Sequence, residues 1–190
     1  NKIAYGKFGR SLDIVNDHIL IGATYAEEAY LFELNNDNDW DYISSFSSDQ
    51  RSKSLKGKTN PCIGGKSGNF DCKDIDMLSF ISPKELTGGS FTELNDLWGW
   101  TDNTTGKEYA LVGLRNGTSF VDISDPTNPN VLGFLPTATT SSIWRDIKVY
   151  KDHAYIVADN VSEHGVQIFD LTQLRGISSF TSFKETANYD

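Results

Sequence analysis

The sequence predicts an all-β fold made of four-stranded antiparallel sheets, and three observations support this prediction. First, a pattern of two apolar residues, one acidic residue and one apolar residue occurs at Leu31–Leu34, Phe120–Ile123 and Ile168–Leu171. Second, the last two copies end 48 residues apart, and the first two end 89 apart, close to twice that spacing. Third, each copy follows segments rich in β-forming residues and precedes a polar turn. A repeat of about 45 residues built from short strands is typical of a β-propeller, in which each repeat forms one blade.

The first blade is predicted within residues 11–46. Ser11–Val15 and Ile19–Ala23 have the composition of two strands joined by a polar turn, and the second is a continuous apolar run, as expected for a buried strand. Ala29–Leu34 and Trp40–Phe46 follow as the third and fourth strands, separated by Asn and Asp residues that are typical of a turn.

Two further blades are predicted near residues 94–135 and 143–183, each with four candidate strands. The expected strands are Leu97–Trp100, Tyr109–Gly113, Thr118–Ile123 and Val131–Leu135 in the first, and Ile143–Tyr150, His153–Ala158, Val166–Leu171 and Ser179–Phe183 in the second. Arg115–Gly117 contains the Asn-Gly pair that is common in β-hairpin turns.

Residues 47–90 interrupt this pattern, because Ser, Lys, Gly and Asp dominate there. The segment is expected to be an irregular insertion with a cysteine loop, and it is long enough to include a degenerate blade, which would account for the doubled spacing. Residues 1–190 are therefore expected to form one β-propeller domain or a partial propeller. Propellers close with about four to eight blades. Three clear blades and a degenerate one would form either a small ring or, as we expect, part of a larger one.

The net charge of −9 argues against a nucleic-acid partner, because phosphate backbones are bound through basic surfaces. No apolar run approaches the ~18 residues of a transmembrane helix, so no membrane insertion is expected in this segment. No cofactor is expected either.

Two cysteines, Cys62 and Cys72, flank a glycine-rich loop. No further cysteine completes a zinc site, and the spacing is not that of a zinc motif. We therefore predict a disulfide, which would place the protein in an oxidising compartment. The alternative is two unrelated reduced thiols.

Several segments resemble known repeat families of β-propellers. Phe8–Leu12, followed by Ile19–Ala23, resembles an FG-GAP repeat, with Thr24 where that family often has proline. Thr118–Pro129 and Gly165–Leu171 resemble the LVIVD repeat.

Leu94–Asp102, Ser142–Ile147 and the cysteine loop that leads into Asp76–Ser79 resemble the choice-of-anchor B family. The combined resemblance covers nearly the whole chain and is more specific from Cys62 to Arg175. It implies a cell-surface or secreted β-propeller with a carboxy-terminal anchoring signal of variable type, and it implies no catalytic residue.

Asp37, Asp39 and Asp41 alternate along the turn before a predicted strand, a spacing at which carboxylates can bind calcium, as in some FG-GAP repeats. The glycine that lets a calcium loop turn is missing, since Trp40 and Tyr42 flank Asp41. These residues are therefore weak metal candidates, and we expect an acidic turn without a tightly bound metal. The histidines are expected to be solvated turn residues: His18, His153 and His164.

A ligand-binding site is predicted around Trp98, Trp100, Trp144, Arg145 and Asp146. Trp98 and Trp144 occupy similar positions in the first strands of two blades, and the first strand of a blade usually lies nearest the propeller axis. Aromatic and arginine side chains there would line a binding mouth. The alternative is that the tryptophans pack between blades and that Arg145 pairs with a neighbouring acid.

Three glycosylation sequons begin at Asn103, Asn116 and Asn160, all in predicted turns, and they matter only in a eukaryotic secretory pathway. No catalytic constellation is recognisable. The leading hypothesis is therefore a non-enzymatic extracellular or cell-surface module that binds a protein or a glycan. Two other hypotheses stand beside it: an extracellular hydrolase or lyase of the propeller type, and a structural subunit that self-assembles into a surface filament or appendage.

Overall fold

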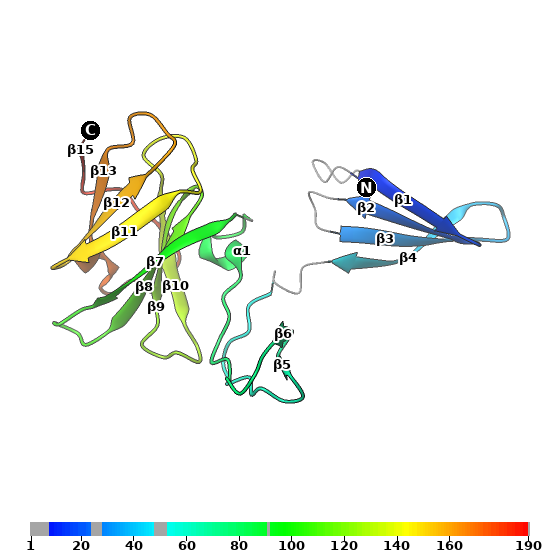
Figure 1. The fold of residues 1–190 in the computed structure, drawn as a ribbon, viewed down its shortest axis with the longest axis horizontal. Helices are drawn as coiled ribbons and strands as arrows, with labels where there is room; N and C mark the ends of the chain where they lie inside the picture. Colours follow the sequence, from blue (N-terminus) through cyan, green and yellow to red (C-terminus); the bar gives the residue numbers. More distant parts are fainter. Residues whose placement is uncertain (1–7, 24–27, 48–52, 91, 190) are drawn as a thin grey trace. The chain divides into compact units, whose positions relative to one another are not determined.

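The structure is a computed structural model, and it describes residues 8–23, 28–47, 53–90 and 92–189. These residues are mostly β-structure, with three sheets of four or five strands and one short two-stranded sheet (Figure 1). The chain divides into two compact units, residues 1–53 and residues 54–190. In the part of the chain that the structure describes, no helix has the length and apolarity needed to cross a membrane.

The first unit is a sheet of four strands, here called sheet 1, in which every neighbouring pair is antiparallel. Its strands, in spatial and sequence order, are β1 (Phe8–Val15), β2 (His18–Ala23), β3 (Glu28–Leu34) and β4 (Trp40–Ser47). The turn from β1 to β2 contains Asn16 with φ of +53°, a conformation that asparagine adopts more readily than most residues. The antiparallel meander predicted for this part of the chain is therefore present.

Sheet 1 exposes apolar side chains on both of its faces. Successive residues of a strand point to opposite faces, and Ile14 and Val15 at the end of β1 are 53% and 61% exposed. Leu20 of β2 and Tyr42 of β4 are also exposed. In globular domains such faces are normally covered by another layer of secondary structure.

The second unit begins with an irregular segment, residues 54–93. It contains a short hairpin and one turn of helix: β5 (Lys66–Ser67), β6 (Phe70–Asp71) and α1 (Pro83–Leu86). The helix begins at Pro83 because the Ser82 hydroxyl accepts a hydrogen bond from the Glu85 amide, and because proline suits the first helical position.

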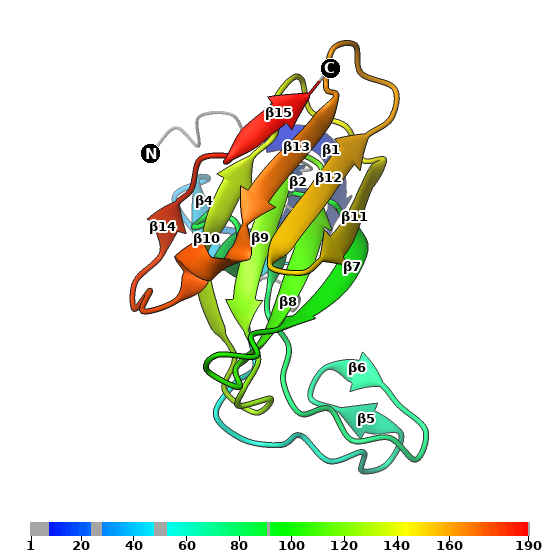
Figure 2. The same ribbon diagram turned by 90° about the vertical axis from the view of Figure 1, so that its left-hand side faces the viewer.

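Sheet 2 follows, and its first four strands pair in sequence order and antiparallel. They are β7 (Leu94–Thr101), β8 (Glu108–Leu114), β9 (Gly117–Asp122) and β10 (Asn130–Pro136). A two-residue turn joins β8 to β9, and Leu114 pairs with Gly117 across it. A fifth strand, β14 (Thr181–Ser182), pairs in parallel with β10 at the outer edge (Figure 2).

Sheet 3 also has four antiparallel strands. They are β11 (Arg145–Tyr150), β12 (His153–Ala158), β13 (Val166–Asp170) and β15 (Ala187–Tyr189), with the 3₁₀ helix η1 (Leu171–Leu174) after β13. The sequence predicts the fourth strand at Ser179–Phe183, but the fourth strand is β15. The earlier segment instead supplies β14 to sheet 2.

This difference has a local cause at Gly133 of β10. A Cβ atom at this position would lie 2.0 Å from the backbone oxygen of Thr181, so glycine is what allows β14 to approach. Phe183 then donates its amide to the Phe134 oxygen at 2.9 Å and places its ring in the core. The segment therefore pairs with the neighbouring sheet rather than with its own.

The main core lies between facing sides of sheets 2 and 3. The rings of Phe120 and Phe169 stack with centroids 4.6 Å apart, and Phe183 packs edge-on against both. On the other face of sheet 2, Val121 packs in a second cluster with Leu86 of α1. The first two residues of this copy of the pattern, Phe120 and Val121, therefore lie on opposite faces of sheet 2.

An ion pair also joins the two sheets. Arg175, just after η1, donates Nε to Asp102 Oδ2 and Nη2 to Asp102 Oδ1, both at 2.8 Å. Asp102 lies at the end of β7, and its side chain is buried. The hydrogen bonds from Arg175 hold the pKa of Asp102 well below its usual range.

Candidate binding surface

The first strands of sheets 2 and 3, β7 and β11, lie side by side and run in the same direction (Figure 1). Asn95 Nδ2 donates to the Arg145 oxygen at 2.7 Å, and the Ile147 amide donates to Asp96 Oδ2 at 2.7 Å. Further along, the ammonium of Lys148 lies 4.5 Å from the centre of the Trp98 ring. Because the contacts advance together along both strands, β7 and β11 are parallel where the two sheets meet.

Four residues of this region define what we call the tryptophan surface: Trp98, Trp144, Asp146 and Lys148. Trp98 is 38% exposed and Trp144 is 57% exposed, so both rings offer contact area to solvent. Lys148 is paired with Asp146 and also sits over the Trp98 ring. The hydrogen bond from Lys148 lowers the pKa of Asp146 and favours its charged form. The surface thus combines two aromatic rings with one charge of each sign.

Two of the predicted site residues lie inside the protein instead. Trp100 is buried and stacks on Tyr109 with ring centroids 5.1 Å apart, in the core between sheets 2 and 3. Arg145 is only 2% exposed. Trp98, Trp144 and Asp146 are therefore exposed, and Lys148 connects Trp98 to Asp146, whereas Trp100 and Arg145 lie in the interior.

Arg145 is paired with a histidine rather than with an acid. Its Nε donates to the Leu114 oxygen at 2.9 Å, and its Nη1 lies 3.2 Å from His164 Nε2. His164 Nδ1 lies 3.1 Å from the Gly165 oxygen. A carbonyl only accepts, so we assign the ring proton to Nδ1, which leaves Nε2 to accept from Arg145. Burial lowers the pKa of Arg145 to about 10.

His164 is the interior residue that sequence reasoning missed. It was expected to be a solvated turn residue, but it is only 2% exposed. The residue lies in the connection between β12 and β13, and its Nε2 lies 3.2 Å from Arg145 Nη1 of β11. No local pattern in the sequence indicates this pairing, because the two residues are brought together only when β11 pairs with β12.

The acidic turn between β3 and β4 is organised around Asn35. Asn35 Oδ1 accepts hydrogen bonds from the amides of Asp37 and Asp39, at 3.0 and 2.9 Å. Asn35 Nδ2 donates to Asp41 Oδ2 at 3.1 Å. Within the described ranges, no group of three or more histidine, cysteine or acidic residues is arranged to hold a metal ion. The expectation of an acidic turn without a tightly bound metal stays a prediction.

The three sequons differ in exposure. Asn103 and Asn160 are exposed. Asn116 is half-buried, its Oδ1 is buried, and Thr118 of the same sequon is fully buried. Attachment of a glycan requires access to the asparagine amide, so the geometry favours the first two sequons over the third.

The predicted disulfide is present, and it joins Cys62 to Cys72 with the Cα atoms 5.9 Å apart. It closes the loop that contains the β5–β6 hairpin, and the Cys62 amide also donates to Asp76 Oδ1 at 2.8 Å. A disulfide is weak evidence for a location outside the cytoplasm, because reducing compartments keep most thiols free.

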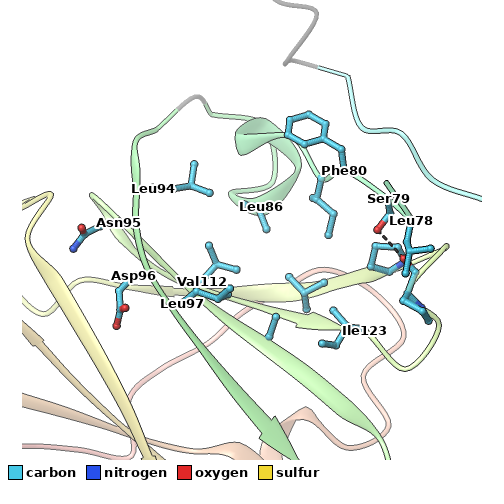
Figure 3. Close-up of a pocket in the computed structure, with 15 residues that line it drawn as sticks. Leu78, Ser79, Phe80, Leu86, Leu94, Asn95, Asp96, Leu97, Val112 and Ile123 are labelled. Atoms are coloured by element: carbon cyan, nitrogen blue, oxygen red, sulfur yellow. Dashed lines mark hydrogen bonds between the residues drawn. The ribbon is translucent and has the colours of Figure 1, made fainter. Parts of the chain in front are cut away.

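A second surface feature is an apolar groove of about 550 Å³ on the face of sheet 2 that points away from sheet 3 (Figure 3). One wall is formed by the chain at 78–81 and by Leu86 of α1, and the floor by side chains of sheet 2. Ser79 Oγ donates to the Pro126 oxygen at 2.8 Å and fixes one end of the wall. The lining is mostly apolar, with Leu94, Leu97, Val112 and Ile123 among its side chains.

Comparison with known protein families matches residues 106–137 to the LVIVD repeat. No curated protein and no solved structure matches the chain. The matched residues begin before β8 and end just after β10, so the repeat corresponds to three strands of sheet 2 and the turns between them. The resemblances to FG-GAP repeats and to the choice-of-anchor B family stay predictions. Residues 106–137 of this chain are an LVIVD repeat.

Proposed function

We propose that this chain is a section of an extracellular β-propeller that binds glycans through the tryptophan surface and does not act as an enzyme. Three features support the propeller. Sheets 2 and 3 pack face to face, their first strands lie in parallel next to each other, and the repeated pattern directs one apolar residue to each face. Consecutive blades of a propeller are related in this way around an axis.

Open apolar faces add to this argument. The groove on sheet 2 and the far face of sheet 3 both carry apolar side chains toward solvent. On sheet 3 these include Tyr150, Val157 and Tyr189, which are 65%, 36% and 65% exposed. Faces of this kind are what neighbouring blades cover in a propeller.

The observation that carries the binding function is the exposure of Trp98 and Trp144 beside the Asp146–Lys148 pair. Tryptophan side chains are enriched among the residues that contribute most to binding. A sugar ring offers C–H groups that stack on an indole and hydroxyl groups that hydrogen-bond to charged side chains. An aromatic surface with one charge of each sign matches this chemistry.

The test is a binding measurement against a panel of soluble polysaccharides, by affinity electrophoresis and by quenching of tryptophan fluorescence. The double variant Trp98→Ala, Trp144→Ala is expected to weaken binding at least about tenfold, which corresponds to about 1.4 kcal/mol. Trp40→Ala is the matched control, because Trp40 is an exposed tryptophan of similar accessibility, 37%, in sheet 1. Equal binding by all three proteins, or binding by none, would contradict the proposal.

A protein partner is the second candidate, because the apolar groove on sheet 2 would be a docking surface if no neighbouring blade covers it. A protein that docks on the groove would bind independently of the two tryptophans, so the same double variant separates the two candidates. The disulfide supports an oxidising compartment for either. The hydrolase or lyase and the surface filament remain hypotheses from the sequence.

A further inference from the structure

The four strands of sheet 3 can be aligned with the first four strands of sheet 2. Phe120 and Ile168 are the first residues of their copies of the repeated pattern, and each lies in the third strand of its sheet. Counting across the strand pairs from these two residues gives further pairs of equivalent positions: Leu111 and Tyr155, Trp98 and Lys148, and Trp100 and Tyr150. The two sheets can therefore be compared residue by residue.

The far face of sheet 3 corresponds to the face of sheet 2 that is buried in the main core. Trp100, Leu111 and Phe120 belong to that core, and they are 6%, 0% and 0% exposed. Ile156 and Phe169 of sheet 3 face the same core, so the residues next to them in their strands point the other way. The far face thus carries the counterparts of the three core residues of sheet 2: Tyr150, Tyr155 and Ile168. The first of these is 65% exposed, so a position that is buried in sheet 2 is open in sheet 3.

The groove side of sheet 2 corresponds in turn to the face of sheet 3 that lies in the main core. Leu97 and Val112 line the groove (Figure 3), and their counterparts in sheet 3 are Ile147 and Ile156. Both isoleucines are fully buried, whereas Leu97 is 64% exposed. The helix α1 packs over β9 and β10, so the β7 side of the groove remains open.

The two open faces are therefore the counterparts of the two faces that already meet in the core. The groove side of sheet 2 points away from sheet 3, and the far face of sheet 3 points away from sheet 2. Because sheets 2 and 3 pack against each other between them, the two open faces cannot meet within one chain. A contact between them requires a second copy of the chain, and that copy carries the same two faces.

We propose that a second copy of this chain covers these faces, so that the far face of sheet 3 in one copy packs against the groove side of sheet 2 in the other. Leu97 of the second copy then occupies the place that Ile147 has in the core, next to Tyr150 and Tyr155 of the first copy. This contact joins two different faces, so further copies add in a row or close into a ring. The inference rests on the propeller arrangement proposed above and is independent of glycan binding.

The experiment is sedimentation velocity of the whole chain from micromolar to near-millimolar concentration, in salt that screens the repulsion between copies of net charge −9. The wild type is expected to associate as its concentration rises. Leu97→Asp places a charge on one face and Tyr150→Asp on the other, so each variant alone is expected to stay monomeric. A mixture of the two variants is expected to form dimers that do not grow further, because each variant keeps the face that the other has lost.

Ile75→Asp is the matched control, because Ile75 is 74% exposed in a loop outside the sheets, and it should associate like the wild type. All three variants should unfold near the wild-type midpoint, since the replaced side chains already contact solvent. Three results would overturn the proposal: a wild type that stays monomeric, association of either sheet variant alone, or a mixture that stays monomeric. A wild type that associates as described but binds no polysaccharide would contradict glycan binding alone.

Discussion

At the scale of single residues, an ion pair between Asp102 at the end of β7 and Arg175 after η1 joins sheet 2 to the chain that follows β13. The aspartate is buried, and both of its oxygens accept hydrogen bonds from one guanidinium. Two-point contacts of this kind are the strongest form of a carboxylate–arginine pair. The two residues are separated by 73 positions in the chain. Local patterns in a sequence do not reveal such a pair, which is why the sequence predicts the strands around it but not the contact itself.

Arg175→Gln is expected to lower the thermal unfolding midpoint by several degrees near neutral pH, because it leaves a buried carboxylate without its partner. The pKa of Asp102 is lowered in the folded protein, so the pair stabilises the fold fully above the pKa of unfolded aspartate, about 3.9. This contribution is lost as the pH falls below that value. The difference between wild type and variant, measured by calorimetry from pH 7 downward, should therefore shrink below about pH 4.

Arg115→Gln is the matched control, since Arg115 pairs with Glu93 at the surface. Exposed pairs contribute about 1 kcal/mol or less. A loss of stability equal to that of Arg175→Gln, or a difference that does not depend on pH, would contradict the role given to Asp102.

At the scale of secondary-structure elements, the position of β14 determines how sheets 2 and 3 are joined. The sequence predicts this segment in sheet 3, but it pairs with β10 of sheet 2. The predicted strands of both sheets have long apolar runs, and these could be identified from the sequence. The three residues of β15 carry almost no such signal, whereas Phe180 and Phe183 make the neighbouring segment look like a strand of sheet 3. Pairing with β10 depends on space beside Gly133, and space between distant strands is not encoded in any local pattern.

Gly133→Ala is expected to detach β14 from β10. The new Cβ would lie 2.0 Å from the Thr181 oxygen and 2.6 Å from the Phe183 ring, so the strand has to move. The hydrogen bond from the Phe183 amide to the Phe134 oxygen would be lost, and exchange of that amide with solvent should become at least about tenfold faster. Gly99→Ala in β7 is the control, because no atom lies within 4 Å of its Cβ position. Slow exchange at Phe183 in both variants would show that β14 does not depend on Gly133.

At the scale of the whole molecule, the repeated pattern explains why sheets 2 and 3 carry apolar side chains both in the core between them and on their outer faces. Phe120 is the first residue of its copy of the pattern, and Phe169 is the second residue of its copy. The two positions lie on opposite faces of a strand, so the two rings can stack on each other in the interface between sheets 2 and 3. The other apolar residue at the start of each copy, Val121 in sheet 2 and Ile168 in sheet 3, faces away from that interface. Each repeat therefore has apolar surface for two neighbours. The repeat spacing predicts the strands that carry these residues, but it does not give the number of sheets that pack against one another.

The far face of sheet 3 provides the test of that two-sided packing. If it is a surface for a neighbouring blade, the isolated chain should bind a hydrophobic dye and associate as its concentration rises, as observed by sedimentation velocity. Val157→Lys with Tyr150→Lys should suppress both effects and leave the unfolding midpoint nearly unchanged, because both side chains already contact solvent. Ile75→Lys is the control, since Ile75 is 74% exposed in a loop outside the sheets. If the wild-type chain stays monomeric and binds no dye, or if Ile75→Lys suppresses association equally well, the far face of sheet 3 is not a packing surface for a blade.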